Sequence, residues 1–135
     1  MYNLELVDFR NMFLLINLSE RNKIRLSLFD ENANQQTEYD GRNRELLASI
    51  ENFFIRQNFL KENLQGIMAV VGAGSFTNTR VSAVVANTFG FVLNIPLLAI
   101  NTDQIEKAQS LIFELLKQPK RQYISATYSA PPNIG

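Results

Sequence analysis

Two short runs of consecutive apolar residues constrain the fold of this chain most strongly. They are Met12–Ile16 and Ile67–Val71, and neither contains a polar side chain. A run of this length and composition is typical of a strand that is covered on both faces. We therefore expect a sheet with helices packed on it, which is an α/β architecture.

The first run is followed by two segments that predict further strands. Apolar and polar residues alternate over Ile24–Phe29, which is the period of a half-buried strand, and Asn34–Tyr39 is polar enough for a sheet edge. Turn-forming residues at Ser19–Asn22 and Asp30–Asn32 separate the strands. Three strands joined by short turns predict an antiparallel meander.

The remaining chain alternates between helical and strand patterns. The order β-β-β-α-β-α-β-α-β predicts a mixed sheet whose later strands are parallel and covered by helices, the ribonuclease-H-like plan. The fold alone does not identify a function. Helices are expected over Arg42–Asn58, Asn78–Leu93 and Asp103–Lys117, and strands over Leu97–Ile100 and Gln122–Tyr128.

Composition excludes several kinds of chemistry. The 135 residues contain neither Cys nor His, so disulfides, thiolate nucleophiles, Ser-His pairs and zinc sites built on thiolate or imidazole are ruled out. Thirteen basic and thirteen acidic residues balance, which argues against nucleic-acid binding by bulk charge but leaves a local basic patch possible. No apolar run is long enough for a bilayer and the beginning is acidic, so we expect a cytoplasmic protein with no membrane contact.

The segment from Gly72 to Arg80 (GAGSFTNTR) has the most distinctive local chemistry. Its two glycines, Gly72 and Gly74, permit positive φ angles at a strand end, and Ser75 or Thr77 can cap the next helix. The helix amides then offer a potential anion site. Lys is absent, as is a third Gly, so the segment matches neither a Walker loop nor a dinucleotide fingerprint. A tight turn with a capping residue remains the alternative.

This nonapeptide resembles the Gly-x-Gly-Ser-Phe-Thr-Gly-x-Arg signature of the TsaB (YeaZ) family. Three other segments are similar to family patterns, and the resemblance covers about Phe13 to Asp103. Leu15–Ser19 resembles an Ile-Asp-Thr-Ser start, Arg42–Leu47 an Arg-x-His-Ser-Glu-Leu-Leu helix opening, and Asn94–Leu97 a Gly-Ile-Pro-Leu segment.

The resemblance implies an actin-like ATPase (sugar-kinase/actin/Hsp70, ASKHA) domain that has no catalysis, cofactor or metal of its own. TsaB proteins bind a TsaD-type enzyme, which transfers threonylcarbamoyl to adenosine 37 of tRNAs, so tRNA would be reached only through the complex. In the family this pairing uses the two helices that flank the signature. The signature residues here are Gly72, Gly74, Ser75, Phe76, Thr77 and Arg80, and the partner-binding candidates are Leu47, Ile50, Phe54, Ala83, Ala86, Asn87 and Gly90.

Alternatives remain for these helix faces. The small residues Ala83, Ala86 and Gly90 permit close approach of a partner helix, but equally of the chain's own sheet. The apolar stripe that begins at Leu46 similarly fits a core, with only part of it covering a partner. A homodimer through the same helices is a further possibility, because related surfaces have similar shapes.

Three departures from the family pattern bear on function. Asn17 stands in place of an Asp, so it lacks the charge that holds a magnesium–nucleotide complex, and Asn43 and Asn78 replace a His and a Gly. These departures argue against nucleotide chemistry in this chain. The alternative function is nevertheless a small nucleotide-binding, phosphotransferase-like domain that uses the Gly72–Thr77 turn. Direct tRNA contact by Lys117, Lys120 and Arg121 is a third hypothesis.

Length is the largest departure, because family members carry a second domain of similar size. We expect a TsaB-like domain over residues 1–118, followed by a strand and a proline-containing tail over 119–135. Tyr128–Pro132 resembles the closing Tyr-x-x-Pro-Pro-type tail of full-length members. That similarity predicts a natural minimal form from which the second domain is deleted.

Overall fold

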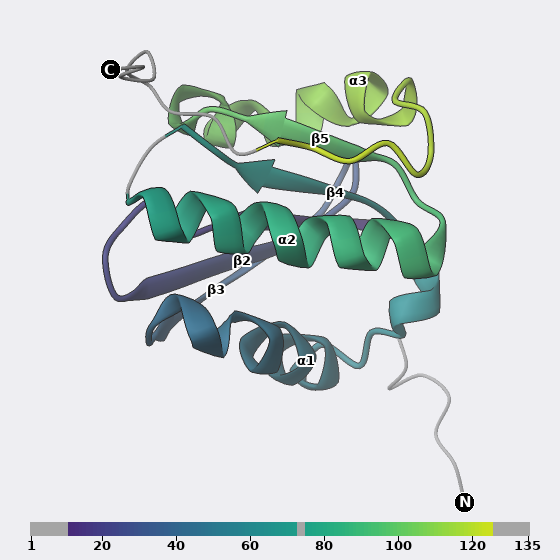
Figure 1. Cartoon of the computed structure of the whole chain (residues 1–135). Coiled ribbons are helices and arrows are strands. Elements are labelled where there is room, and N and C mark those ends of the chain that lie inside the picture. Colours follow the sequence, from purple (N-terminus) through teal and green to yellow (C-terminus); the bar gives the residue numbers. More distant parts are fainter. Residues whose placement is uncertain (1–10, 73–74, 126–135) are drawn as a thin grey trace, which may run out of the picture.

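A computed structural model describes residues 11–72 and 75–125 of the chain. Its centre is a five-stranded mixed sheet with the strand order β3-β2-β1-β4-β5 (Figure 1). The meander β1-β2-β3 is antiparallel, and β4 and β5 are parallel to β1. The predicted ribonuclease-H-like sheet, with the polar third strand at its edge, is confirmed. The strands are β1 (Met12–Asn17), β2 (Lys23–Phe29), β3 (Asn34–Asp40), β4 (Leu64–Val70) and β5 (Leu97–Ile100).

Helices cover both faces of this sheet (Figure 1). The long helices α1 and α2 pack on one face, while η4 and α3 pack on the other. None of the helices in the described part of the chain is long and apolar enough to cross a bilayer. The helices are α1 (Leu46–Arg56), α2 (Phe76–Leu93) and α3 (Ile112–Leu116), with 3₁₀ helices η2 (Asn43–Glu45), η3 (Lys61–Asn63) and η4 (Thr102–Leu111).

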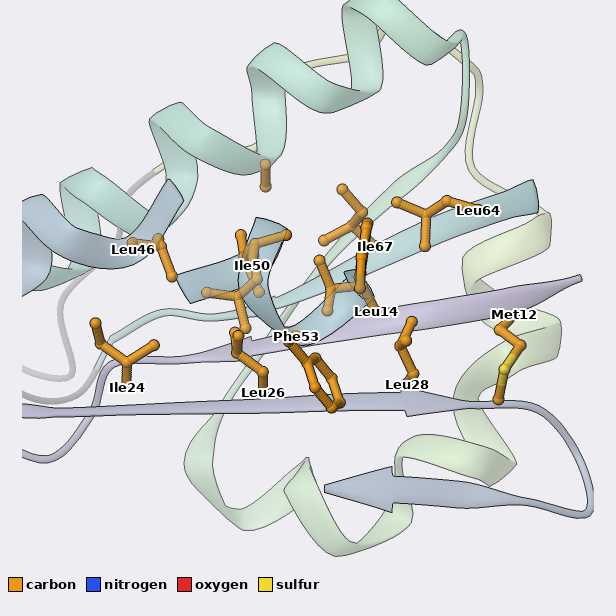
Figure 2. Close-up of a cluster of buried hydrophobic side chains, with 14 of the residues drawn as sticks. Met12, Leu14, Ile24, Leu26, Leu28, Leu46, Ile50, Phe53, Leu64 and Ile67 are labelled. Carbon is orange, nitrogen blue, oxygen red and sulfur yellow. The ribbon is translucent and has the colours of Figure 1, made fainter. Parts of the chain in front are cut away.

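Successive side chains of the central strand β1 belong alternately to two separate hydrophobic cores. In β1, Leu14 and Ile16 point toward α1 and α2, whereas Phe13 and Leu15 point toward α3. Both faces of β1 are buried, which explains why the sequence shows a continuous apolar run there. Figure 2 shows the larger core, in which Phe53 of α1 lies on the sheet.

Four predicted elements differ in the structure. The first turn of the helix expected over Arg42–Asn58 is the 3₁₀ helix η2, and α1 spans Leu46–Arg56. The helix expected from Asn78 begins at Phe76, because Ser75 is its N-cap. Most of the helix expected over Asp103–Lys117 is the 3₁₀ helix η4, in which Ala108 is the buried residue, so little packing favours α-helical geometry there. Residues 122–125 of the expected last strand form no strand, and the rest of that strand lies outside the described residues.

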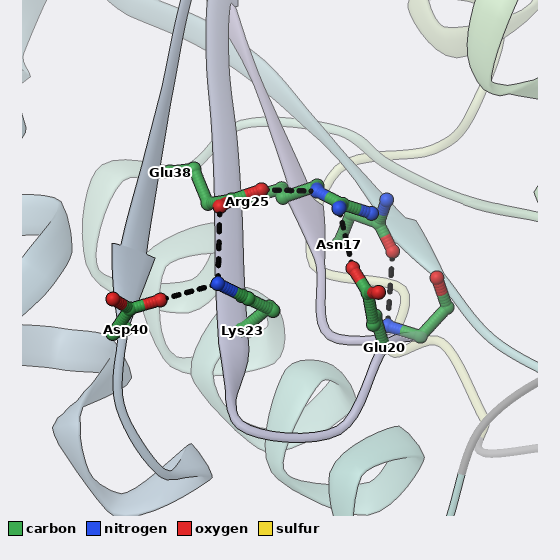
Figure 3. Close-up of polar contacts among 7 residues, drawn as sticks. Asn17, Glu20, Lys23, Arg25, Glu38 and Asp40 are labelled. Carbon is green, nitrogen blue, oxygen red and sulfur yellow. Dashed lines mark hydrogen bonds and ion pairs between the residues drawn. The ribbon is translucent and has the colours of Figure 1, made fainter.

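A ladder of charged side chains lies on the outer half of the sheet (Figure 3). Arg25 of β2 forms ion pairs with Glu20 and Glu38, and Lys23 with Glu38 and Asp40. The Arg25 Nε to Glu38 Oε1 distance is 2.8 Å. Cross-strand pairs of opposite charge fix the register of β2 against β3.

This ladder predicts a dependence of stability on pH. The hydrogen bonds from Arg25 and Lys23 lower the pKa of Glu38 below its ordinary value of 4.5. The contribution of Glu38 to stability is therefore complete above pH 4.5 and is lost as the pH falls through the lower folded-state pKa. We expect denaturant unfolding to show a smaller loss of stability on acidification for Glu38→Gln than for the wild type. An identical loss in both proteins contradicts this assignment.

Candidate functional site

The glycine turn is a strand-to-helix connection with a defined cap. Gly72 has a φ of 83°, a left-handed conformation that favours glycine. The Ser75 hydroxyl accepts a hydrogen bond from the Asn78 N–H at 3.0 Å and so caps α2. The predicted signature residue Gly74 lies outside the described residues, and Phe76 is the first residue of α2. Of the two predicted caps, Ser75 performs that role.

The two signature departures Asn43 and Asn78 contact each other. The Asn43 Nδ2 donates to the Asn78 Oδ1 at 2.8 Å, and the Asn78 Nδ2 donates to the Leu18 carbonyl at 3.1 Å. These bonds join the end of β1, the turn before α1 and the start of α2. A glycine at position 78 has no side chain with which to form either bond. The departures therefore constitute a local tether.

This tether predicts an energetic coupling between its two asparagines. Single replacement of Asn43 or Asn78 by Ala is expected to lower the free energy of unfolding by about 1 kcal/mol, because each leaves polar groups unpaired. The loss of unfolding free energy in the double variant is expected to be smaller than the sum of the two single losses by about 0.5 kcal/mol or more. Urea unfolding of the four proteins measures the coupling, and strict additivity contradicts the bond.

Asn17 occupies the position at which the family pattern has an aspartate. Its side chain is buried, and its Oδ1 accepts a hydrogen bond from the Ser19 N–H at 2.9 Å. The amide thus closes the turn after β1 and is neutral. Within the described residues, no group of three or more His, Cys, Asp or Glu is placed to hold a metal ion.

The outer face of α2 is apolar although it faces away from the sheet. Val84 is 61% exposed, Phe91 51% and Val92 71%, and neighbouring Leu47 of α1 is 50% exposed. Scattered exposed apolar residues are common, but these adjoin: Leu47 and Val92 line one hollow, Val84 and Phe91 line another, and Thr88 lines both. We call the exposed residues Leu47, Val84, Phe91 and Val92 the outer patch.

A groove runs between α1 and α2, and two residues of the outer patch, Leu47 and Val92, line it. It has a volume of about 250 Å³ and a largely apolar lining. Two further hollows adjoin α2, one with Thr77 and Arg80 in its lining and one with Phe91 and Tyr123. The groove is lined by Leu47, Glu51, Lys61, Val85, Thr88, Phe89, Val92 and Leu93.

The structure places most of the predicted partner-binding residues inward, on the chain's own sheet. A Cβ atom at Gly90 would lie 2.9 Å from Leu97 Cδ1, and Ala83 and Ala86 are likewise buried. The alternative of close helix–sheet packing therefore holds for these three positions. In α1, Ile50 and Phe54 belong to the core, and Leu47 lies at the surface.

Asn87 has a different role from the other predicted helix residues. Its Oδ1 accepts the Ile124 N–H at 2.8 Å, and its Nδ2 donates to the Ile124 carbonyl at 3.1 Å. A side-chain amide thereby pairs with both backbone groups of one residue, as a neighbouring strand would. This pair holds Ile124 on α2, and the Arg121 guanidinium lies over the Phe91 ring.

The exposed residues Val84, Phe91 and Val92 were not among the partner-binding residues predicted from the sequence. The available signal was that α2 carries apolar side chains around most of its circumference: Val81, Val85 and Phe89 pack against the core, whereas Val84, Phe91 and Val92 are exposed. A helix that is apolar all round is usually buried on both faces. In this fold only one face of α2 is covered.

Comparisons with known proteins give a match by structure alone. No protein-family model and no curated protein matches the sequence. YeaZ from Pseudomonas aeruginosa superposes with a TM-score of 0.63 at 18% identity, covering 77% of this chain and 50% of that chain. The chain has a YeaZ-like fold. A second structure, described as an uncharacterized protein with similarity to peptidase YEAZ from Pseudomonas aeruginosa, gives a TM-score of 0.64 at 18% identity over 76% and 48% of the two chains.

The match defines which part of the YeaZ architecture is present. This chain spans about half the length of both YeaZ-like structures, and its sheet and helices correspond to the first domain of YeaZ. At 18% identity the similarity establishes the fold. The GAGSFTNTR segment, which resembles the family signature, spans the connection between β4 and α2 and the start of α2.

Proposed function

We propose that this chain is a non-catalytic docking subunit for a TsaD-type threonylcarbamoyltransferase, with tRNA as the substrate of the assembly. The observation that carries the proposal is the outer patch on α1 and α2. The TsaB family uses the same two helices for pairing with TsaD. The YeaZ-like fold supports the correspondence between those helices and α1 and α2.

The physical argument rests on the second apolar face of α2. Ala83, Ala86 and Gly90 bring the helix close to its own sheet, so Val84 and Val92 point away from it. Burying such side chains against a partner contributes about 25 cal/mol for each Å² of apolar surface removed from water. The α1–α2 groove would accept side chains from a facing helix, and Leu47 would form one of its walls.

The absence of catalysis is part of the same proposal. The sequence has no His or Cys to act as a base or nucleophile, and Asn17 supplies a neutral amide at the position of the family's aspartate. The signature turn then has a structural role, because Gly72 and Ser75 set where α2 begins. In this proposal residues 1–118 are the docking domain, and residues 119–135 are the carboxyl-terminal segment that follows it in the sequence.

Mixing the purified chain with a TsaD-type enzyme at micromolar concentrations tests the proposal. Titration calorimetry is expected to give a saturable complex with a negative heat-capacity change, the mark of apolar burial. Absence of heat and of co-elution on a sizing column contradicts the proposal. Self-association of the chain through the same helices, with no binding of the enzyme, favours the homodimer alternative instead.

A further inference from the structure

A basic cavity opens at the end of the molecule where α1 and α2 begin. It has a volume of about 600 Å³, and three separate segments form its wall: the β1–β2 turn, the β3–α1 connection and the start of α2. The lining comprises Leu18, Ser19, Arg21, Asn22, Lys23, Gly41, Arg42, Asn43, Arg44, Ser75 and Asn78. Four of these residues are cations and none is a carboxylate.

Hydrogen bonds hold the three segments together. The Gly41 N–H donates to the Asn22 carbonyl at 3.0 Å, which joins the β3–α1 connection to the β1–β2 turn. The Asn43–Asn78–Leu18 tether joins the same connection to α2 and β1. The cavity is therefore a fixed frame, and its guanidinium groups extend from segments whose relative positions are set.

Neighbouring carboxylates cancel only part of the positive charge of the cavity. Lys23 forms ion pairs with Glu38 and Asp40, so its charge is balanced. Within the described residues, Arg21, Arg42 and Arg44 take part in no ion pair and are exposed. The Glu45 carboxylate lies 3.5 Å from the Arg42 backbone nitrogen and offsets part of this charge. Two or more positive charges remain concentrated on a chain whose formal net charge is zero.

We propose that this cavity binds the phosphate backbone of RNA through Arg21, Arg42 and Arg44. Guanidinium groups are suited to phosphate oxygens because they donate two parallel hydrogen bonds. The lining has no aromatic side chain on which a base would stack and no carboxylate to hold a magnesium–nucleotide complex. Contacts limited to phosphates give binding that is independent of sequence. The cavity lies beside the proposed docking helices, so bound RNA would be held next to a docked enzyme.

Fluorescence anisotropy with the isolated full chain tests this site. The wild type is compared with the triple variant Arg21→Ala/Arg42→Ala/Arg44→Ala and with the control Lys107→Ala/Lys117→Ala/Lys120→Ala, which removes equal charge from exposed positions elsewhere. The control also tests two of the three basic residues that sequence analysis considered for tRNA contact. The probes are a transfer RNA and an unrelated single-stranded RNA. The choice of transfer RNA rests on the proposed function, whereas the second probe does not.

At about 0.1 M salt, the cavity variant is expected to bind both RNAs at least about tenfold more weakly than the wild type does. The slope of log affinity against log salt concentration is negative, and its magnitude is expected to be smaller by about two in the cavity variant. The control is expected to change affinity less than about twofold. Absence of RNA binding by the wild type, or equal losses in the two variants, overturns the proposal.

A competition arm separates RNA from a small nucleotide. If ATP with magnesium binds tightly through the same arginines and displaces RNA, the ligand is a nucleoside triphosphate and the RNA assignment is wrong. Retention of RNA binding in millimolar ATP supports the assignment of RNA as the ligand. No transferase is present in these assays, so their outcome does not depend on whether the chain docks on a TsaD-type enzyme.

Discussion

Val92→Glu is expected to abolish measurable binding of a TsaD-type enzyme. Val92 is 71% exposed in the isolated chain and lines the α1–α2 groove, so a partner helix would bury it. A carboxylate buried there without a cation loses its hydration, and we expect binding to weaken at least 100-fold, about 3 kcal/mol. Calorimetric titration of the enzyme with the variant measures this loss.

The stability of Val92→Glu separates a lost contact from a lost fold. Because position 92 is exposed, we expect its free energy of unfolding to stay within about 0.5 kcal/mol of the wild type. The matched control is Phe113→Glu, which places the same charge on α3, across the sheet, at a residue that is 69% exposed. If both variants lose binding equally, or if neither variant loses binding, docking on the outer patch is contradicted.

Gly90→Leu is expected to destabilise the fold itself. A Cβ atom at this position would lie 2.9 to 3.0 Å from three atoms of the Leu97 side chain, so that side chain or the spacing between α2 and β5 has to shift. Overpacking of this kind costs about 1–3 kcal/mol, and the better helix propensity of Leu returns less than 1 kcal/mol. We expect a net loss of about 2 kcal/mol, measured by urea unfolding.

Two comparisons make this second prediction specific. Val84→Leu enlarges a side chain on the opposite, exposed face of the same helix and is expected to change stability by less than about 0.5 kcal/mol. In the Gly90→Leu background, Leu97→Ala opens space beside position 90 and is expected to cost less than it does in the wild type. Additive losses would show that Gly90 and Leu97 do not compete for the same volume.

The strands were the part of the fold that the sequence predicted best. Met12–Ile16 and Ile67–Val71 are apolar throughout because both faces of β1 and β4 are buried, and this pattern has few alternatives. The helix expected to end at Leu93 does so, and Asn94 adopts a φ of 55° at its C-cap. Local chemistry and burial agree at these positions.

The two faces of α2 could not be assigned from the sequence. Small residues such as Ala86 and Gly90 suit any close neighbour, whether a strand of the same chain or a helix of another. Strand β5 follows α2 and lies parallel to β4, and its Leu97 side chain occupies the space that Gly90 leaves. The partner-binding hypothesis was therefore placed on the buried face, whereas the exposed apolar side chains are on the other.

Contacts between distant residues were also beyond local patterns. Asn43 and Asn78 are 35 residues apart. In the sequence, each was interpreted only as a departure from the family pattern. Only the folded chain shows that they bond to each other. The pairing of Asn87 with the backbone of Ile124 is of the same kind, and it stands in place of part of the strand expected over Gln122–Tyr128.

Reconstituted modification of tRNA tests the account most directly. A TsaD-type enzyme is supplied with tRNA and a threonylcarbamoyl donor, with and without this chain, and modified adenosine 37 is quantified by mass spectrometry. We predict that the chain raises the yield, that Val92→Glu does not, and that the chain without the enzyme forms no product. Product formed by the chain alone, or a yield that its addition leaves unchanged, would contradict the role of a docking subunit.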